Sequence, residues 1–212
     1  MSPGLLHIRS NVTSPVLTPT TYNTWYDTVH IPELCSIPGG PKQAHRYRAT
    51  DPACQKWNFL ALYPLDDIAF ISDPKIKERV SSHHPILPKG KSIWELVELE
   101  GRDYTAVGDS HGFLGRKAKF ISTVEIDARN EHEEIVDKRM NEHLPMLKCR
   151  RYKIHRAPTA MAGEHSVEVH APKDLFIYGS DNKDDIERVA QSLHEALDGV
   201  RVDFEWTSWE AI

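Results

Sequence analysis

Cysteine is scarce in this 212-residue sequence, which contains only Cys35, Cys54 and Cys149. The three are odd in number, lie far apart and form no CxxC motif. A disulfide framework and a thiolate metal site both need cysteines in suitably spaced sets. We therefore expect reduced thiols and neither kind of site.

Long apolar runs and blocks of like charge are also missing. No stretch approaches the roughly 20 apolar residues that span a bilayer, and residues 1–11 lack the charged and apolar parts of a signal peptide. The 26 basic and 31 acidic residues give a net charge of -5, without a basic block that would follow a phosphate backbone. We expect a cytoplasmic protein with no nucleic-acid or membrane partner.

The motifs of cofactor and nucleophile chemistry are absent as well. The sequence has no glycine-rich phosphate loop, no GxSxG elbow and no nucleotide fingerprint. Its 12 histidines include His83 beside His84, and His165 near His170. These groups lack the i, i+4 spacing or the third ligand that a zinc or iron site needs. The sequence predicts no metal site and no cofactor.

One short phrase, in contrast, occurs twice. The sequence HIPEL at residues 30–34 recurs as HLPML at residues 143–147, 113 residues later. Each copy ends a stretch with helical periodicity and precedes a basic, aromatic segment, at 43–48 in the first case and 150–155 in the second. Repetition of a supersecondary unit predicts that the two halves of the chain fold alike.

The first half has the pattern of a β-α-β-β-α-β unit. Residues 5–9 alternate as a strand, and a stripe of aromatic and apolar residues at helical spacing then runs to His30. Because Pro32 removes a backbone donor, we expect the helix to end there, with His30 in its last turn. Further strands are expected at 43–50, 56–64 and 92–100, and a weaker helix at 66–80.

The second half repeats this order. Strands are expected at 119–127, 148–157, 174–179 and 200–208, and helices at 130–144 and 184–197. The glycine-rich segment 108–112 between the halves is typical of a linker. We divide the chain into a first ferredoxin-like repeat at 1–105, a linker at 106–116 and a second repeat at 117–212.

Two such sheets, each covered by helices on one face, can bury their remaining apolar faces against each other. We therefore predict an α+β fold in which two ferredoxin-like repeats form a barrel within one chain, with further association left open. The segment WYDTVHIP at 25–32 resembles the helix motif of EthD-type proteins in the dimeric α/β-barrel superfamily. The resemblance implies the same barrel, in a superfamily that includes cyclases, decarboxylases, dehydratases, cofactor-free monooxygenases and haem-binding members.

His30 is the first catalytic candidate, because it shares the apolar stripe of its helix with Tyr26, one turn away. The helix C-terminus favours its charged form and burial favours its neutral form, so we expect a pKa near neutrality, at which the ring can give or take a proton. His7 is expected to face the same cavity, as strand histidines do in cyclases of the superfamily that the chain resembles. Tyr26 is expected to donate a hydrogen bond to a carbonyl that becomes an enolate.

The residues expected to bind substrate are mostly aromatic: Trp25, Asp27, Tyr47, Trp57, Tyr63, Trp94 and His143. The second helix carries Lys138, Arg139 and Met140 in place of the Trp-Tyr-Asp run before His30, so we expect the working site in the first half. A plainer interpretation stays open. The His-x-Pro phrases then terminate helices, the aromatic residues pack in the core, and Asp27 is solvated.

We expect a cofactor-independent enzyme that uses a histidine for proton transfer on a small apolar, aromatic or polyketide-like metabolite. Cyclisation, dehydration and decarboxylation all fit this chemistry. The alternatives are a non-catalytic small-ligand carrier, a structural module and a cofactor-free monooxygenase. A cavity reached by His30 favours the enzyme, a cavity without a titratable group favours the carrier, and solid packing favours the structural role.

Overall fold

The structure is a computed structural model, and it describes most of the chain. The described residues are 1–107, 117–127, 133–143, 148–162, 165–168, 172–198, 200 and 202–212.

The first half supplies four strands and the helical segments that join them. Its strands are β1 (Gly4–Val12), β2 (His45–Ala49), β3 (Phe59–Leu65) and β4 (Val97–Val107). Its helical segments are α1 (Pro19–Trp25), the π-helical turn η1 (Tyr26–His30), α2 (Ile31–Cys35), the 3-10 turn η2 (Ile68–Ser72), α3 (Lys75–Arg79) and the 3-10 turn η3 (Ile93–Glu95).

The second half contributes five strands and two longer helices. The strands are β5 (Phe120–Asp127), β6 (Lys148–Ala162), β7 (His165–Glu168), β8 (Asp174–Ser180) and β9 (Asp203–Ala211). The helices are α4 (Glu133–His143) and α5 (Lys183–Leu197). No helix in these described segments, or in those of the first half, is long and apolar enough to cross a membrane.

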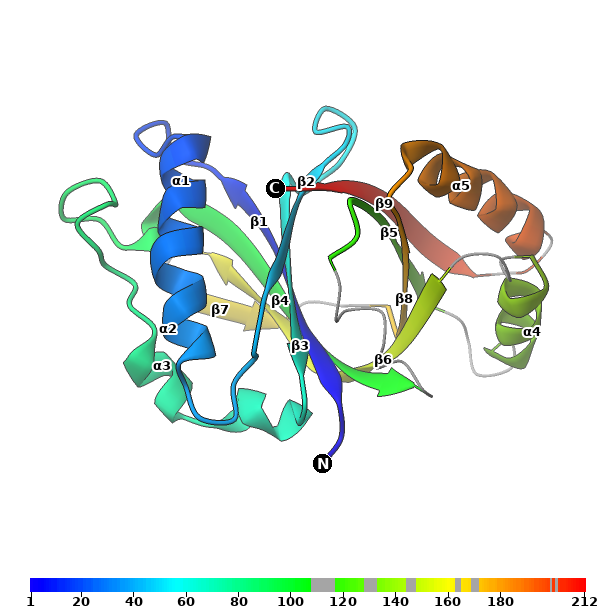
Figure 1. The fold of residues 1–212 in the computed structure, drawn as a ribbon, viewed down its shortest axis with the longest axis horizontal. Helices are drawn as coiled ribbons and strands as arrows, with labels where there is room; N and C mark the ends of the chain where they lie inside the picture. Colours follow the sequence, from blue (N-terminus) through cyan, green and yellow to red (C-terminus); the bar gives the residue numbers. More distant parts are fainter. Residues whose placement is uncertain are drawn as a thin grey trace.

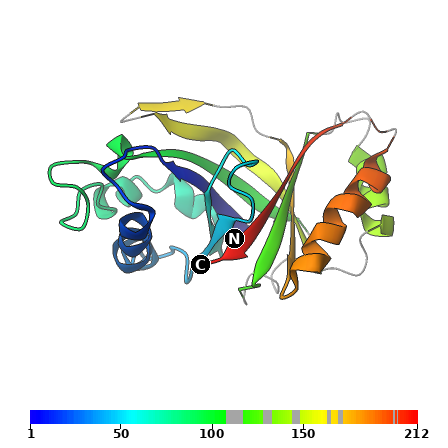
Figure 2. The ribbon, with the colours of Figure 1, turned by 90° about the horizontal axis from the view of Figure 1, so that it is seen from above.

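Eight strands form a closed antiparallel barrel, which confirms the predicted α+β barrel. They pair in the order β4-β1-β3-β2-β9-β5-β8-β6, and β6 pairs in turn with β4, so the ring closes within one chain. β7 pairs with β6 outside the ring, and the two strands reach toward the side on which α1 lies (Figure 2). Helices α1 and α2 cover one side of the barrel, and α4 and α5 cover the opposite side (Figure 1).

The expected strand at 92–100 was wrong at its start. Ser92 and Glu95 form a capping box. The Glu95 carboxylate accepts from the backbone N–H of Ser92, and the Ser92 hydroxyl accepts from backbone N–H groups of the turn, so residues 93–95 form η3. The strand β4 begins only at Val97 and runs through Val107, into the expected linker. Residues 108–116 of that linker lie outside the described residues.

The expected helix at 66–80 is replaced by two short segments. η2 begins where the Asp67 carboxylate accepts from the backbone N–H of Ala69, and it ends before Asp73, which is extended. Pro74 follows, and a proline disfavours helical geometry in the residue before it. The separate helix α3 therefore starts after Pro74.

The first long helix does not end at Pro32, contrary to the sequence prediction. It widens into the π-helical turn η1, where the N–H of Ile31 donates to the carbonyl of Tyr26, five residues back. Pro32 follows directly as the second residue of α2, and the helical segment continues through it to Cys35. His30 therefore lies inside a continuous helical segment and not in its last turn.

Strand alternation divides the side chains into a lumen and two outer layers. The lumen cluster draws apolar residues from all eight barrel strands, among them Leu5, Tyr47, Leu62 and Trp209. One outer layer packs beneath α1 and η1, and the other packs beneath α4 and α5. The sheet therefore separates residues that are neighbours in sequence.

A buried network of charges inside the lumen ties the two halves together. Arg9 donates to Glu100 at 2.6 Å and to Glu125 at 3.2 Å, and Arg102 contacts the same carboxylates, each at 2.6 Å. The side chains of these four residues are at most 7% exposed. Burial alone would raise the pKa of Glu100, but the two guanidinium groups hold it below its usual value.

We predict that Glu125→Gln destabilises the protein by roughly 3–5 kcal/mol, because it removes one of the two buried carboxylates that neutralise Arg9 and Arg102. Urea unfolding at pH 7 measures this change. Glu210→Gln is the matched control, since Glu210 pairs with the exposed Arg48 across neighbouring strands and should change stability by less than about 1 kcal/mol. Equal losses in the two variants would contradict the structural role of the lumen network.

Candidate functional site

His30 lies in an aromatic setting between the first helix and the sheet. Its ring stacks on Trp25 at 5.1 Å between centroids and meets Tyr26 edge-on at 4.7 Å. The Nδ1 atom of His30 is buried and has no hydrogen-bond partner among the described residues. The π-helical turn produces this arrangement, because it brings the ring of His30 back over Trp25, five positions earlier.

Burial is the main influence on the charge of His30. It lowers the pKa of His30 to about 4; Glu33 opposes the shift and Arg46 adds to it. The expectation of a pKa near neutrality was wrong, because a ring inside the helix does not meet the free carbonyls of a helix end. At neutral pH, His30 is therefore an uncharged imidazole with a lone pair available.

Two phenols lie next to His30 in the same layer. The hydroxyl of Tyr63, on β3, donates to that of Tyr26 at 2.9 Å, and both side chains are buried. Burial raises the pKa of both phenols. Tyr26 and Tyr63 are therefore neutral hydrogen-bond donors over the whole range in which the protein would be assayed.

Arg46, on β2, is a site residue that the sequence reasoning missed. Its guanidinium lies 4.4 Å from the centre of the Tyr26 ring, donates to Asp27 at 2.8 Å and donates to Asn23 at 2.6 Å. Asp27 is therefore half-exposed but engaged in an ion pair, not merely solvated. The alternation of His45, Arg46 and Tyr47 was the available signal, since it places the arginine on the face opposite its two aromatic neighbours.

His7 does not share this layer, which corrects the expectation that it faces the same cavity. Residues of β1 alternate, so Leu5, His7 and Arg9 point into the lumen, while Ser10 bonds Tyr22 beneath α1. His7 is fully buried, and neither ring nitrogen has a partner from another described residue. Burial, with help from Arg9 and Arg102, lowers its pKa well below the usual value.

The remaining candidates are divided in the same way. Tyr47 and Trp57 belong to the lumen cluster, so the sheet separates them from His30. Trp94 packs against the outer cluster from η3. His143 is the last residue of α4, but its side chain lies outside the described residues, as does all of 144–147. The structure thus brings together His30, Tyr26, Trp25, Asp27 and Tyr63.

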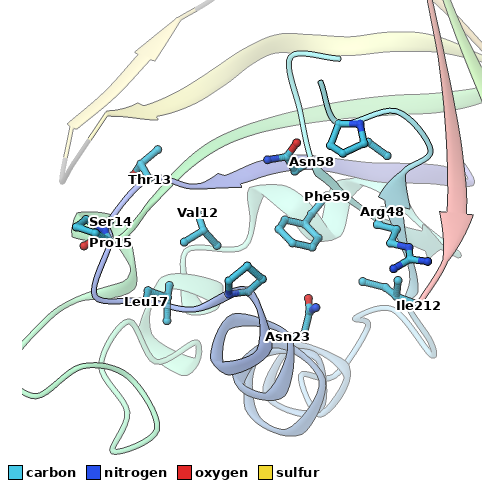
Figure 3. A pocket seen from close by; sticks show the side chains of 13 residues that line it. Val12, Thr13, Ser14, Pro15, Leu17, Asn23, Arg48, Asn58, Phe59 and Ile212 are labelled. Atoms are coloured by element: carbon cyan, nitrogen blue, oxygen red, sulfur yellow. The ribbon is translucent and has the colours of Figure 1, made fainter. Parts of the chain in front are cut away.

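An open groove lies at the N-terminal end of α1, in the same layer between helix and sheet (Figure 3). Its volume is about 560 Å³, and its walls include Val12, Leu17, Asn23, Arg48 and Phe59. None of the nine predicted site residues whose side chains the structure describes lines this groove. Within the described segments, no cluster of three or more histidine, cysteine or acidic side chains is arranged to hold a metal ion.

Known proteins resemble this chain in structure only. No family model matches the sequence. No curated protein matches it. A candidate chlorite dismutase superposes with a TM-score of 0.61 at 12% identity, covering 100% of this chain and 95% of its own.

Two further structures give similar superpositions. A candidate monooxygenase from Fusobacterium nucleatum subsp. nucleatum has a TM-score of 0.53 at 9% identity, covering 99% of this chain and 92% of its own. An anthrone oxidase-like protein has a TM-score of 0.52 at 9% identity, covering 100% and 91%. At such identities the likeness shows the fold alone, and that fold is the barrel of dimeric α/β-barrel proteins.

We predict that His30 makes the folded state acid-sensitive. Between pH 6.5 and about 4 the unfolded chain binds a proton that folded His30 does not, so stability is fully present above pH 6.5 and falls as the pH drops through this window. The loss from His30 should approach about 3 kcal/mol by pH 4. Urea unfolding of wild type and His30→Gln at several pH values should show a smaller acid loss in the variant.

His194→Gln is the control for this titration, because His194 is an exposed histidine in α5. Its acid dependence is the reference against which the change in His30→Gln is judged. An identical acid dependence in His30→Gln would contradict the buried, neutral state of His30.

Proposed function

We propose that this protein is a cofactor-independent enzyme in which His30 transfers a proton on a small, largely apolar metabolite of aromatic or polyketide-like character. Cyclisation or dehydration would follow from the enolate that the transfer produces, whereas in decarboxylation the loss of CO2 would produce the enolate, which would then take up a proton. The observation that carries the proposal is the buried, unpartnered Nδ1 of a neutral His30 beside the Tyr26–Tyr63 phenol pair.

The residues around His30 would have different roles in such a reaction. His30 accepts the proton, since its ring is uncharged at neutral pH and one nitrogen has no other partner. Tyr26 receives its hydrogen bond from Tyr63 and so keeps its own O–H to donate to a developing enolate oxygen. Arg46 places a positive charge against the Tyr26 ring, which favours an anion nearby.

We also infer that the two halves are repeats of one β-α-β-β-α-β unit of EthD-like type. The strand order supports this inference. Counted along each half, without β7, the strands of both sheets stand in the order fourth, first, third, second. The helices occupy corresponding places in the second half, where α4 follows its first strand and α5 its third.

The second candidate function is a non-catalytic carrier of a small ligand. The groove at α1 favours it, because this concave surface is lined without His30, Tyr26 or His7. A third possibility, a cofactor-free monooxygenase, takes its support from the names of the candidate monooxygenase and the anthrone oxidase-like protein. Oxygen consumption during turnover would distinguish it from a cyclase or dehydratase.

We predict that His30→Gln lowers the rate of proton transfer by about 100-fold or more, the usual contribution of a positioned general base. Deuterium exchange into an aromatic ketone with an acidic C–H, such as 2-tetralone, measures this step by NMR. His143→Gln is the matched control and should have a smaller effect, because its helix lacks the aromatic pair before the histidine.

The reverse ranking of the two histidine variants would move the site to the second half. If neither variant changes the exchange rate, the catalytic proposal fails and the carrier remains. An absorption band above 350 nm that co-purifies with the protein would contradict the cofactor-independent part of the proposal.

A further inference from the structure

We propose that the groove at the N-terminal end of α1 binds a small aromatic molecule with one negative charge, such as an aromatic carboxylate. This inference deepens the second candidate function and does not depend on catalysis by His30. The groove's volume of about 560 Å³ lies within the usual range for small-molecule sites, roughly 300–1,000 Å³. A molecule with two fused rings fits comfortably within that volume.

The walls of the groove are suited to a flat apolar body. Val12 from β1 and Leu17 before α1 face Phe59 at the start of β3 (Figure 3). The ring of Phe59 packs against the ring of Tyr22, with 5.2 Å between the two ring centres. Tyr22 is itself fixed by a 2.7 Å hydrogen bond with Ser10. A ligand ring would therefore meet an aromatic side chain that is already in place.

The positive charge of the groove comes from Arg48, and the main-chain oxygen of Ile212, another lining residue, already accepts from the Lys117 ammonium. Arg48 carries the only ionisable side chain among the described residues that line it, and this side chain is 60% exposed. Its Nε and Nη2 atoms both donate to one oxygen of Glu210, at 3.2 and 2.8 Å. A guanidinium has five N–H donors, so Arg48 has donors left for a ligand carboxylate.

A second donor, the side chain of Asn23, also lines the groove (Figure 3). The amide oxygen of Asn23 already accepts from Arg46, which leaves the amide N–H groups of Asn23 as donors. A carboxylate ligand is bound by hydrogen-bond donors and a positive charge. Asn23 supplies donors, and Arg48 supplies both donors and the charge. A neutral amide of the same shape would lose the charge-assisted part of the interaction.

Two probes of equal shape test the proposal, 2-naphthoate and naphthalene-2-carboxamide, with binding measured by isothermal titration or ligand-observed NMR. We expect the carboxylate to bind about tenfold more tightly than the amide. Arg48→Gln should remove that preference. Glu210→Gln should strengthen carboxylate binding several-fold, since it releases the guanidinium from its internal partner.

Arg188→Gln is the matched control, because Arg188 is also an exposed arginine that pairs with an acidic residue, Asp185, but lies on α5. It should leave the affinities of both probes unchanged. Phe59→Leu should weaken both probes to a similar extent, because it removes the aromatic wall and keeps the charge.

Equal affinity for the two probes, or a carboxylate preference that survives Arg48→Gln, would overturn the proposal. His30→Gln should not alter binding of either probe. This comparison separates the groove from the proposed proton transfer, because exchange can be lost while binding persists, and binding can be absent while exchange persists.

Discussion

Closure of the sheet into a ring is the constraint on which the rest of this structure depends. A closed ring has no free edge, and each strand must give alternate side chains to the lumen and to the helices. One strand therefore builds two separate environments. On β1, Arg9 enters a charged network inside the barrel, while Ser10 bonds Tyr22 beneath α1. The candidate chemistry of the outer layer is insulated from the lumen by the sheet itself.

The two sides of the sheet use charge differently. In the lumen, Arg9 and Arg102 are enclosed with carboxylates from both halves of the chain, so their charges hold the barrel together and are not offered to a ligand. Beneath α1, Arg46 is also buried, but it lies against the aromatic ring of Tyr26 and reaches the half-exposed Asp27. A positive charge at the margin of an aromatic layer can respond to a bound anion, whereas one locked within the core cannot.

The sequence was a good guide where one signal dominated. Alternation placed β5, and helical periodicity placed α5, each within about one residue, whereas the alternating strand expected at 200–208 lies at Asp203–Ala211. It was a poor guide where two signals competed. Residues 92–96 are apolar enough for a strand, but the Ser92–Glu95 capping box stabilises a 3-10 turn there. The face of His7 was open to either assignment, because Leu5 and Leu6 are both apolar and both sides of β1 are covered. The pairing of Arg46 with Asp27 needed the position of β2 under α1, which spacing along the chain does not give.

The π-helical turn at Tyr26–His30 is equivalent to one extra residue within an otherwise α-helical segment. Each residue of an α-helix turns the chain by about 100°, so deleting one residue here would rotate His30 and all of α2 relative to Trp25 by roughly that angle. The stacked pair would be lost although every side chain in it remained. Among relatives of this protein, a one-residue difference in length at this turn would therefore mark a change in how the histidine is presented, even where the residues around it are the same.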